Sequence, residues 1–175
     1  MSLLHRIATA TVSWALSVCI ILASGLAGAR ADEKRWRLFD QGNDAFLVVA
    51  ETDQLDRPAL PEFSCRKAIG FIDVYGEAKE NLRMAMAERI RTGQAPWIQF
   101  VPDYSDKTTF VDLSFSHEGW RYKYSLIADH EAFERLKREG VLEFKLGTVL
   151  VHEEFTAGLD NVSKFLDLCN KGFYK

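Results

Sequence analysis

The sequence predicts an α+β fold with a mostly antiparallel sheet and about three helices, the last of which is tied to the strand region by a disulfide bond. Two observations lead to this prediction. Short apolar runs of strand character alternate with single amphipathic segments across short loops, an order typical of antiparallel sheets with helices on one face. In addition, only Cys65 and Cys169 remain once a predicted amino-terminal leader is removed, and an even pair of cysteines favours a bridge.

Eight apolar runs rich in β-branched and aromatic residues are predicted to form strands. They are residues 36–39, 45–50, 63–75, 97–101, 108–115, 120–128, 141–146 and 148–155. Residues 41–44 hold Gly and Asn between two such runs and predict a hairpin. The run 63–75 carries apolar side chains on both faces, so we expect a strand that is covered on both sides. Residues 53–61 are predicted to be a loop, because their prolines remove backbone donors.

Three segments repeat apolar side chains at three- and four-residue spacing and are predicted to be helices. Residues 77–92 and 129–139 are each followed by a glycine that can end a helix, and Asp129 is expected to cap the second. Residues 159–169 are predicted to form the third helix, with Cys169 on its buried stripe. The apolar stripe of the first helix consists of Leu82, Ala85, Met86 and Ile90.

Residues 1–31 have the pattern of a secretory signal peptide. Arg6 precedes an uncharged run over residues 7–28, and small side chains fit cleavage after either Ala29 or Ala31. The run is also long enough to span a bilayer, so a retained anchor is the alternative. The alanine pattern after the run favours cleavage. We therefore expect residues 32–175 to be a single α+β domain, periplasmic or secreted, with no membrane attachment after cleavage.

In an oxidising compartment, Cys65 and Cys169 are expected to form a structural disulfide rather than stay as free thiols. In the chain-entropy model a closed loop of about 100 residues contributes about 4.7 kcal/mol. The chain has no Cys-x-x-Cys motif, so a thioredoxin-type redox centre or a cysteine zinc cluster is not predicted.

Composition and motifs argue against several classes of protein. A net charge of −3 gives no basic footprint, so we predict no nucleic-acid partner. The zinc-protease, nucleophile-elbow and phosphate-loop motifs do not occur, and no metal, cofactor or catalytic residue is predicted. The histidines of the predicted domain, His117, His130 and His152, are expected at the surface. Glu153 and Glu154 are neighbours in a predicted strand and should point to opposite faces.

The most specific local pattern is residues 119–126, in which Trp120, Tyr122 and Tyr124 share one face of a predicted strand. One interpretation is an aromatic platform that binds a glycan or peptide, joined by Trp97. The other is the core face of an antiparallel strand, with the tyrosine hydroxyls at its rim. The core interpretation is favoured, because the opposite face of the strand is already polar.

A tryptophan near the predicted mature start and the closing segment from Gly158 to Leu168 resemble small periplasmic proteins of the invasion-associated locus B type. The resemblance covers little of the chain. It therefore supplies no function or site residue.

A signal peptide without a catalytic motif behind it predicts an exported, non-enzymatic accessory or binding domain of the cell envelope. Its partner would be a protein or a glycan of the envelope. One alternative is an envelope hydrolase that uses carboxylates or a histidine, with His117, His152 and Glu153 as the residues to test. The other is an inhibitor of a foreign enzyme.

Overall fold

The computed structural model describes residues 34–53, 60–102 and 109–170, and the predicted signal peptide lies outside the described residues. The described strands are β1 (Arg35–Gln41), β2 (Asp44–Ala50), β3 (Glu62–Arg66), β4 (Phe71–Glu77), β5 (Trp97–Phe100), β6 (Thr109–Phe110), β7 (Asp112–Ser116), β8 (Gly119–Ile127), β9 (Val141–Leu146) and β10 (Val149–Glu154). The described helices are α1 (Glu80–Arg91), α2 (Glu131–Glu139) and α3 (Leu159–Asn170).

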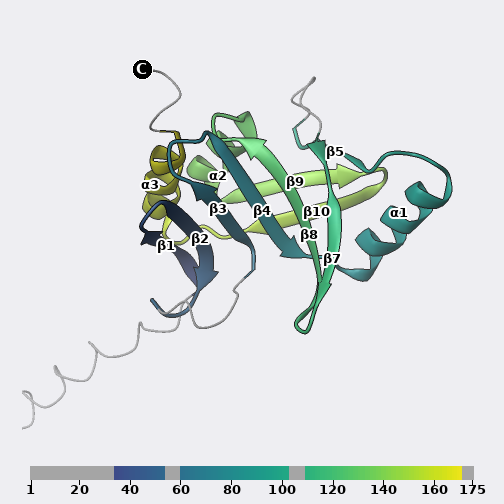
Figure 1. The fold of residues 1–175 in the computed structure, drawn as a ribbon, viewed down its shortest axis with the longest axis horizontal. Coiled ribbons are helices and arrows are strands. Elements are labelled where there is room, and N and C mark those ends of the chain that lie inside the picture. The colour runs from purple at the N-terminus through teal and green to yellow at the C-terminus, as the bar shows by residue number, and fades with distance from the viewer. Residues whose placement is uncertain (1–33, 54–59, 103–108, 171–175) are drawn as a thin grey trace, which may run out of the picture. The chain divides into compact units, whose positions relative to one another are not determined.

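The strands form two antiparallel sheets (Figure 1). The larger sheet has the order β1-β2-β3-β4-β8-β7, and the smaller has the order β10-β9-β5-β6. Each pairing between described strands is antiparallel. The predicted α+β class with antiparallel strands and three helices is therefore confirmed. The difference is that the strands divide between two sheets, whereas the sequence predicted one.

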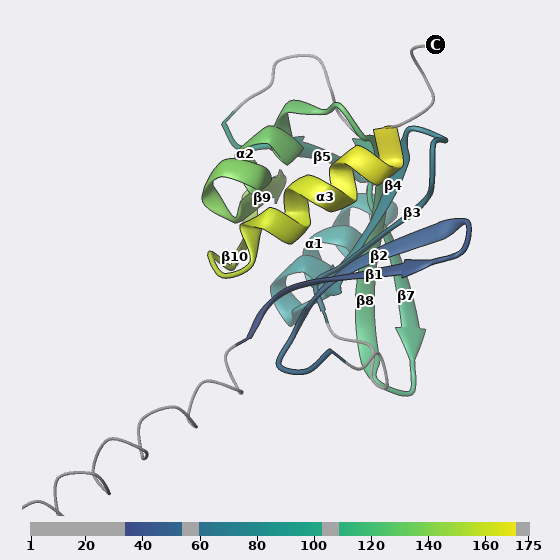
Figure 2. The same cartoon turned by 90° about the vertical axis from the view of Figure 1, so that its left-hand side faces the viewer.

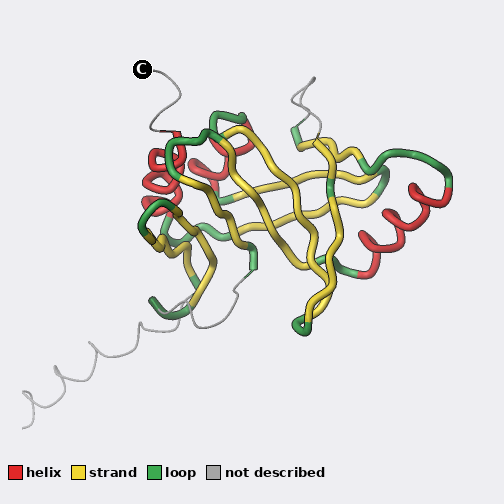
Figure 3. Tube along the Cα trace, viewed as in Figure 1, coloured by secondary structure: helices red, strands yellow, loops and turns green. Residues whose placement is uncertain are grey.

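The helices lie at two ends of the sheets (Figure 3). The last helix, α3, packs against β1, β2 and α2 (Figure 2), and α2 packs against β9. Helix α1 lies at the other end, where it contacts β9 and β10 (Figure 1). None of the described helices is long and apolar enough to cross a bilayer.

The predicted single strand over residues 63–75 is wrong, because the structure has two strands, β3 and β4, with a turn between them. In this turn Ala68 has a φ of 62° and Gly70 a φ of 79°. The backbone N–H groups of Ala68 and Gly70 donate to the carbonyls of Leu168 and Cys169 at the end of α3. The turn thus satisfies carbonyls that a helix end leaves without partners, a long-range cause that local periodicity does not contain.

The predicted strand over residues 108–115 is also divided, and residue 108 lies outside the described residues. Its first part, β6, pairs with β5 in the smaller sheet, and its second part, β7, pairs with β8 in the larger sheet. Between them Val111 is fully buried, and its N–H donates to the carbonyl of Pro96. The run therefore passes from one sheet to the other at Val111.

Helix α2 is capped by His130 and not by Asp129 as the sequence predicted. The Nδ1 atom of His130 accepts a hydrogen bond from the Ala132 N–H at 3.1 Å. His130 is only 2% exposed, so its predicted surface position is wrong. A neutral imidazole nitrogen can accept at a helix start as a short polar side chain does, and this role places the ring in the interior.

The two ends of the described domain meet at β1. The indole Nε1 of Trp36 donates to the Phe155 carbonyl at 2.8 Å, and the Asn161 amide donates to the Trp36 carbonyl at 2.9 Å. At the other end of α3 the predicted disulfide between Cys65 and Cys169 is present, with a Cα–Cα distance of 5.9 Å. Cys169 is fully buried in α3, as its place on the helical stripe predicted. These contacts fix the last helix to the first three strands.

Candidate functional site

The structure separates the four aromatic side chains that the sequence brought together. Tyr122 and Tyr124 are 0% and 2% exposed, whereas Trp97 and Trp120 are 44% and 41% exposed. Both tyrosine rings pack edge-on against Phe144 of the opposite sheet, with centroids 5.3 Å apart. The two tyrosines thus occupy the core, as the favoured interpretation predicted. That interpretation is wrong for Trp120, which is not buried, and for the Tyr124 hydroxyl, which is buried instead of lying at the rim. Their rings offer no face to a ligand in solvent, so the four side chains do not form one platform.

The two tryptophans also lie in different places. Trp97 of β5 stacks on Phe110 of β6, with ring centroids 3.6 Å apart, in the smaller sheet. Trp120 is the second residue of β8 in the larger sheet and packs against Phe115 of β7, with centroids 5.3 Å apart. Trp120 lines a groove at the surface.

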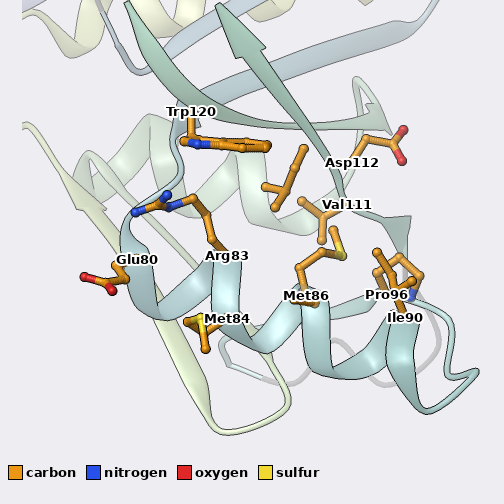
Figure 4. Close-up of a pocket in the computed structure, with 11 residues that line it drawn as sticks. Glu80, Arg83, Met84, Met86, Ile90, Pro96, Val111, Asp112 and Trp120 are labelled. Atoms are coloured by element: carbon orange, nitrogen blue, oxygen red, sulfur yellow. The ribbon is translucent and has the colours of Figure 1, made fainter.

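This groove runs between α1 and the β7–β8 hairpin and has a volume of about 600 Å³ (Figure 4). Its walls are mostly apolar. The side chains that define it are Met84, Met86, Ile90, Val111, Leu113 and Trp120. Met84 and Ile90 are 65% and 67% exposed, which is unusual for large apolar residues and leaves an apolar surface open to solvent. Ile90 belongs to the apolar stripe that the sequence predicts for this helix, but the structure buries only Leu82 and Met86 of that stripe and leaves Ile90 exposed.

A polar hollow of similar volume, about 600 Å³, continues the groove beyond Trp120. Glu80, Arg83 and Trp120 line both hollows, so the two form one continuous surface. The polar hollow lies between the end of β4, the start of α1 and the β7–β8 turn. Its charged side chains are Glu77, Lys79, Glu80, Arg83, Glu118 and Arg121. We call the whole surface the Trp120 groove, with an apolar end and a charged end.

Arg83 stands where the two ends of the Trp120 groove meet. Its guanidinium carbon lies 5.9 Å from the centroid of the Trp120 ring, a cation–π arrangement (Figure 4). The Nε–H of Arg83 is buried and has no hydrogen-bond partner among the described residues. Arg121 of the charged end has a similar buried Nε, but its guanidinium is paired with Glu118. Buried donors normally have partners, so Arg83 is the group in this groove that most needs an acceptor.

Of the residues named for a hydrolase, His152 and Glu153 lie in β10, away from the Trp120 groove, and His117 lies in the β7–β8 turn. Burial raises the pKa of the Glu153 carboxyl, which accepts from the Tyr122 hydroxyl at 3.4 Å. His152 and Glu153 line a pocket of only about 40 Å³, room for about one water molecule. His117 is exposed in the β7–β8 turn, beside Glu118. These three residues do not face a common cleft.

His152 belongs to an ion-pair network on the other face of β10. Its Nδ1 lies 2.6 Å from Glu143 and its Nε2 lies 3.2 Å from Glu154. The hydrogen bond with Glu143 raises the pKa of the His152 imidazole, and that with Arg135 lowers the pKa of Glu143. Glu153 and Glu154 therefore point to opposite faces, as predicted. Among the described residues no cluster of three or more His, Cys, Asp or Glu side chains is placed to hold a metal ion.

Comparison of the chain with protein-family models, with curated proteins and with solved structures finds no match in any of the three.

Proposed function

We propose that the chain is an exported, non-enzymatic binding domain that holds an apolar segment of a partner protein in the Trp120 groove. The observation that carries this proposal is the open apolar end, where Met84, Ile90 and Trp120 are all more than two-fifths exposed. Exposed apolar surface of this kind marks interaction sites, and methionines adapt their shape to partner side chains. Partly exposed tryptophan and arginine are the residues that most often anchor protein interfaces.

A protein partner fits this surface better than a glycan. Sugars are held by hydrogen-bonding side chains around an aromatic face, whereas the apolar end is lined by Met, Ile, Val and Leu side chains. A binding role also fits better than a hydrolase, since the pocket at His152 and Glu153 has no room for a substrate. If the partner is a foreign enzyme, the domain is an inhibitor, and the identity of the partner decides this.

The proposed location is the periplasm or the outside of the cell. The signal-peptide pattern of residues 1–31 and the Cys65–Cys169 disulfide both support it, because disulfides persist in oxidising compartments. Mass spectrometry of protein from its native host should find a mature chain that begins at Arg30 or Asp32, with both cysteines oxidised. An intact Met1 form or reduced thiols would contradict the proposal.

Photo-crosslinking tests the binding role directly. A photoreactive benzoylphenylalanine in place of Met84 should capture one protein from envelope extract, and the same group in place of Glu134, which is exposed on α2, should not. The captured protein is then purified and titrated against the wild type and the Met84→Glu variant. We expect saturable binding that Met84→Glu abolishes. Equal capture from both positions would contradict the proposal. An unchanged affinity of the Met84→Glu variant for the captured protein would contradict it as well.

A further inference from the structure

We infer that the Trp120 groove selects a partner segment in which bulky apolar side chains are followed by an internal Glu or Asp, whose carboxylate binds Arg83. This inference rests on the proposed function and adds the chemistry of the segment. The carboxylate would accept from the guanidinium at the junction of the two ends of the groove, while the apolar side chains occupy the end lined by Met84 and Ile90.

Arg83 differs from other arginines of the domain in its ion pairing. Several described arginines already have a carboxylate partner; these are Arg37, Arg91, Arg121, Arg135 and Arg138. Arg83 takes part in none of the ion pairs between described residues, and its Nε–H is buried without an acceptor. Because Arg83 lines both hollows and has no carboxylate partner among the described residues, its guanidinium group is complementary to a carboxylate. Guanidinium–carboxylate hydrogen bonds are among the strongest that proteins form.

Arg83 is also held in place before any ligand arrives. The helix α1 fixes its backbone, and the Trp120 ring lies against its guanidinium group. Little side-chain freedom then remains to be lost when a carboxylate binds, so the contact adds more affinity than a mobile surface lysine would.

The length of the groove distinguishes an acidic side chain from a chain terminus as the source of the carboxylate. The groove does not stop at Arg83, because the charged end continues beyond it with a volume of about 600 Å³. A segment that places a carboxylate at Arg83 can therefore run on past it, between Lys79 and Arg121. This continuity favours an internal acidic residue over a terminal carboxylate.

A protein segment is also a better occupant than a fatty acid, although both join an apolar part to a carboxylate. Met84 and Ile90 are about two-thirds exposed, so an acyl chain lying on them would keep much of its surface in water. A partner protein covers the open side of the groove with its own surface and removes that cost.

The test is selection from a random peptide library displayed on phage, with the full mature chain as bait. Four baits are compared, namely the wild type and the variants Arg83→Gln, Arg91→Gln and Met84→Glu. Arg91→Gln is the matched control, because it removes the same charge from the same helix at an exposed site outside the groove. We expect wild type and Arg91→Gln to enrich peptides with an internal Glu or Asp after apolar residues. Arg83→Gln should lose the acidic preference and keep the apolar one.

The peptide that binds best is then titrated against each protein in two forms, one with its Glu or Asp unchanged and one with that residue replaced by the amide, Gln or Asn. The amide should bind the wild type about tenfold more weakly, the usual effect of losing a charge-assisted hydrogen bond. The two peptides should bind Arg83→Gln equally, and Arg83→Lys should restore part of the difference.

Each other result has a defined meaning. Apolar peptides that are enriched without an acidic residue, or with a free carboxyl terminus at Arg83, overturn the inference and leave the proposed function in place. If Met84→Glu enriches the same peptides as the wild type, both are overturned. Displacement of the best peptide by laurate at a lower concentration than by the peptide itself would make the groove a lipid site and overturn both as well.

Discussion

The ring of Tyr122 lies directly over Gly76, its cross-strand neighbour in the larger sheet. A Cβ atom added at Gly76 would fall 2.1 Å from the Cζ and hydroxyl oxygen of that ring. Only a residue without a side chain lets the ring turn across β4 and reach Phe144 and Glu153 of the other sheet. This close approach explains why Tyr122 is enclosed while Trp120, on the same face of the same strand, stays at the surface.

Gly76→Ala should therefore destabilise the domain strongly. Overpacking a rigid core costs about 1–3 kcal/mol, and here the clash is with a ring that has no free space to move into. Chemical denaturation measures the free energy of unfolding of the variant. The control is the same substitution in a Tyr122→Ala background, where the added methyl group meets no ring and should cost far less. Equal losses in the two backgrounds would show that the contact with Tyr122 is not the cause.

Trp120→Ala should weaken binding of the partner captured at the groove while the domain stays folded. Truncation of a central tryptophan at an interface typically costs about 2 kcal/mol or more, roughly a thirtyfold rise in Kd. Phe71→Ala is the matched control, because Phe71 is an aromatic residue that is 52% exposed and pairs with Ile127 at the other end of β8. Titration of each variant by calorimetry gives the Kd, and circular dichroism confirms the fold. A loss of affinity shared by both variants would point to a general effect of aromatic truncation.

Local sequence patterns predicted most of the elements but not the places where distant segments shape them. The helices and the alternation of β8 follow from spacing alone, because an element that buries one face must repeat apolar residues at its own period. The turn at Ala68 and Gly70 exists because it meets the end of α3, and the break at Val111 exists because the chain changes sheets there. Neither cause is local, so periodicity joined each pair of strands into one.

The Trp120 groove was missed for a similar reason. The sequence singled out Trp120, but the groove needs α1 to stand beside the β7–β8 hairpin, a tertiary arrangement. One local signal was present, since Met84, Ala87 and Ile90 recur every third residue and form a second apolar line beside the buried stripe of Leu82 and Met86. An apolar line on an otherwise exposed helix face indicates a docking surface, but spacing alone joined Ile90 to the stripe of Leu82 and Met86.

Removal of the disulfide should lower stability by about 2–5 kcal/mol, the usual cost in a small domain. The Cys65→Ala/Cys169→Ala variant removes both sulfur atoms, so no free thiol is left to react. The physical reason is that the bond closes a separation of 104 residues and thereby limits the unfolded chain. Thermal unfolding with and without a reducing agent provides the measurement. The reducing agent should lower the Tm of the wild type and leave the Tm of the double variant unchanged. A wild-type Tm that is the same with and without the reducing agent would contradict the prediction.

Stability should depend on pH through His152. Its imidazole lies between Glu143 and Glu154, and the hydrogen bond with Glu143 raises its pKa above the ordinary value of 6.5. A raised folded-state pKa means that the protonated form is favoured by folding. The stabilisation is fully present below pH 6.5 and is lost as the pH rises through the raised pKa. Because the side chain is 44% exposed, solvent screening keeps the effect below about 1 kcal/mol.

The comparison with His152→Gln isolates this effect from other titrating groups. The variant keeps Glu143 paired with Arg135, which holds the pKa of Glu143 low in both proteins. Denaturation at a series of pH values should show the wild type more stable than His152→Gln at pH 6 and below, with the difference shrinking as the pH rises. NMR titration of the imidazole protons measures the raised pKa directly. A difference in stability that grew with pH would reverse the sign and show that His152 is favoured in its neutral form.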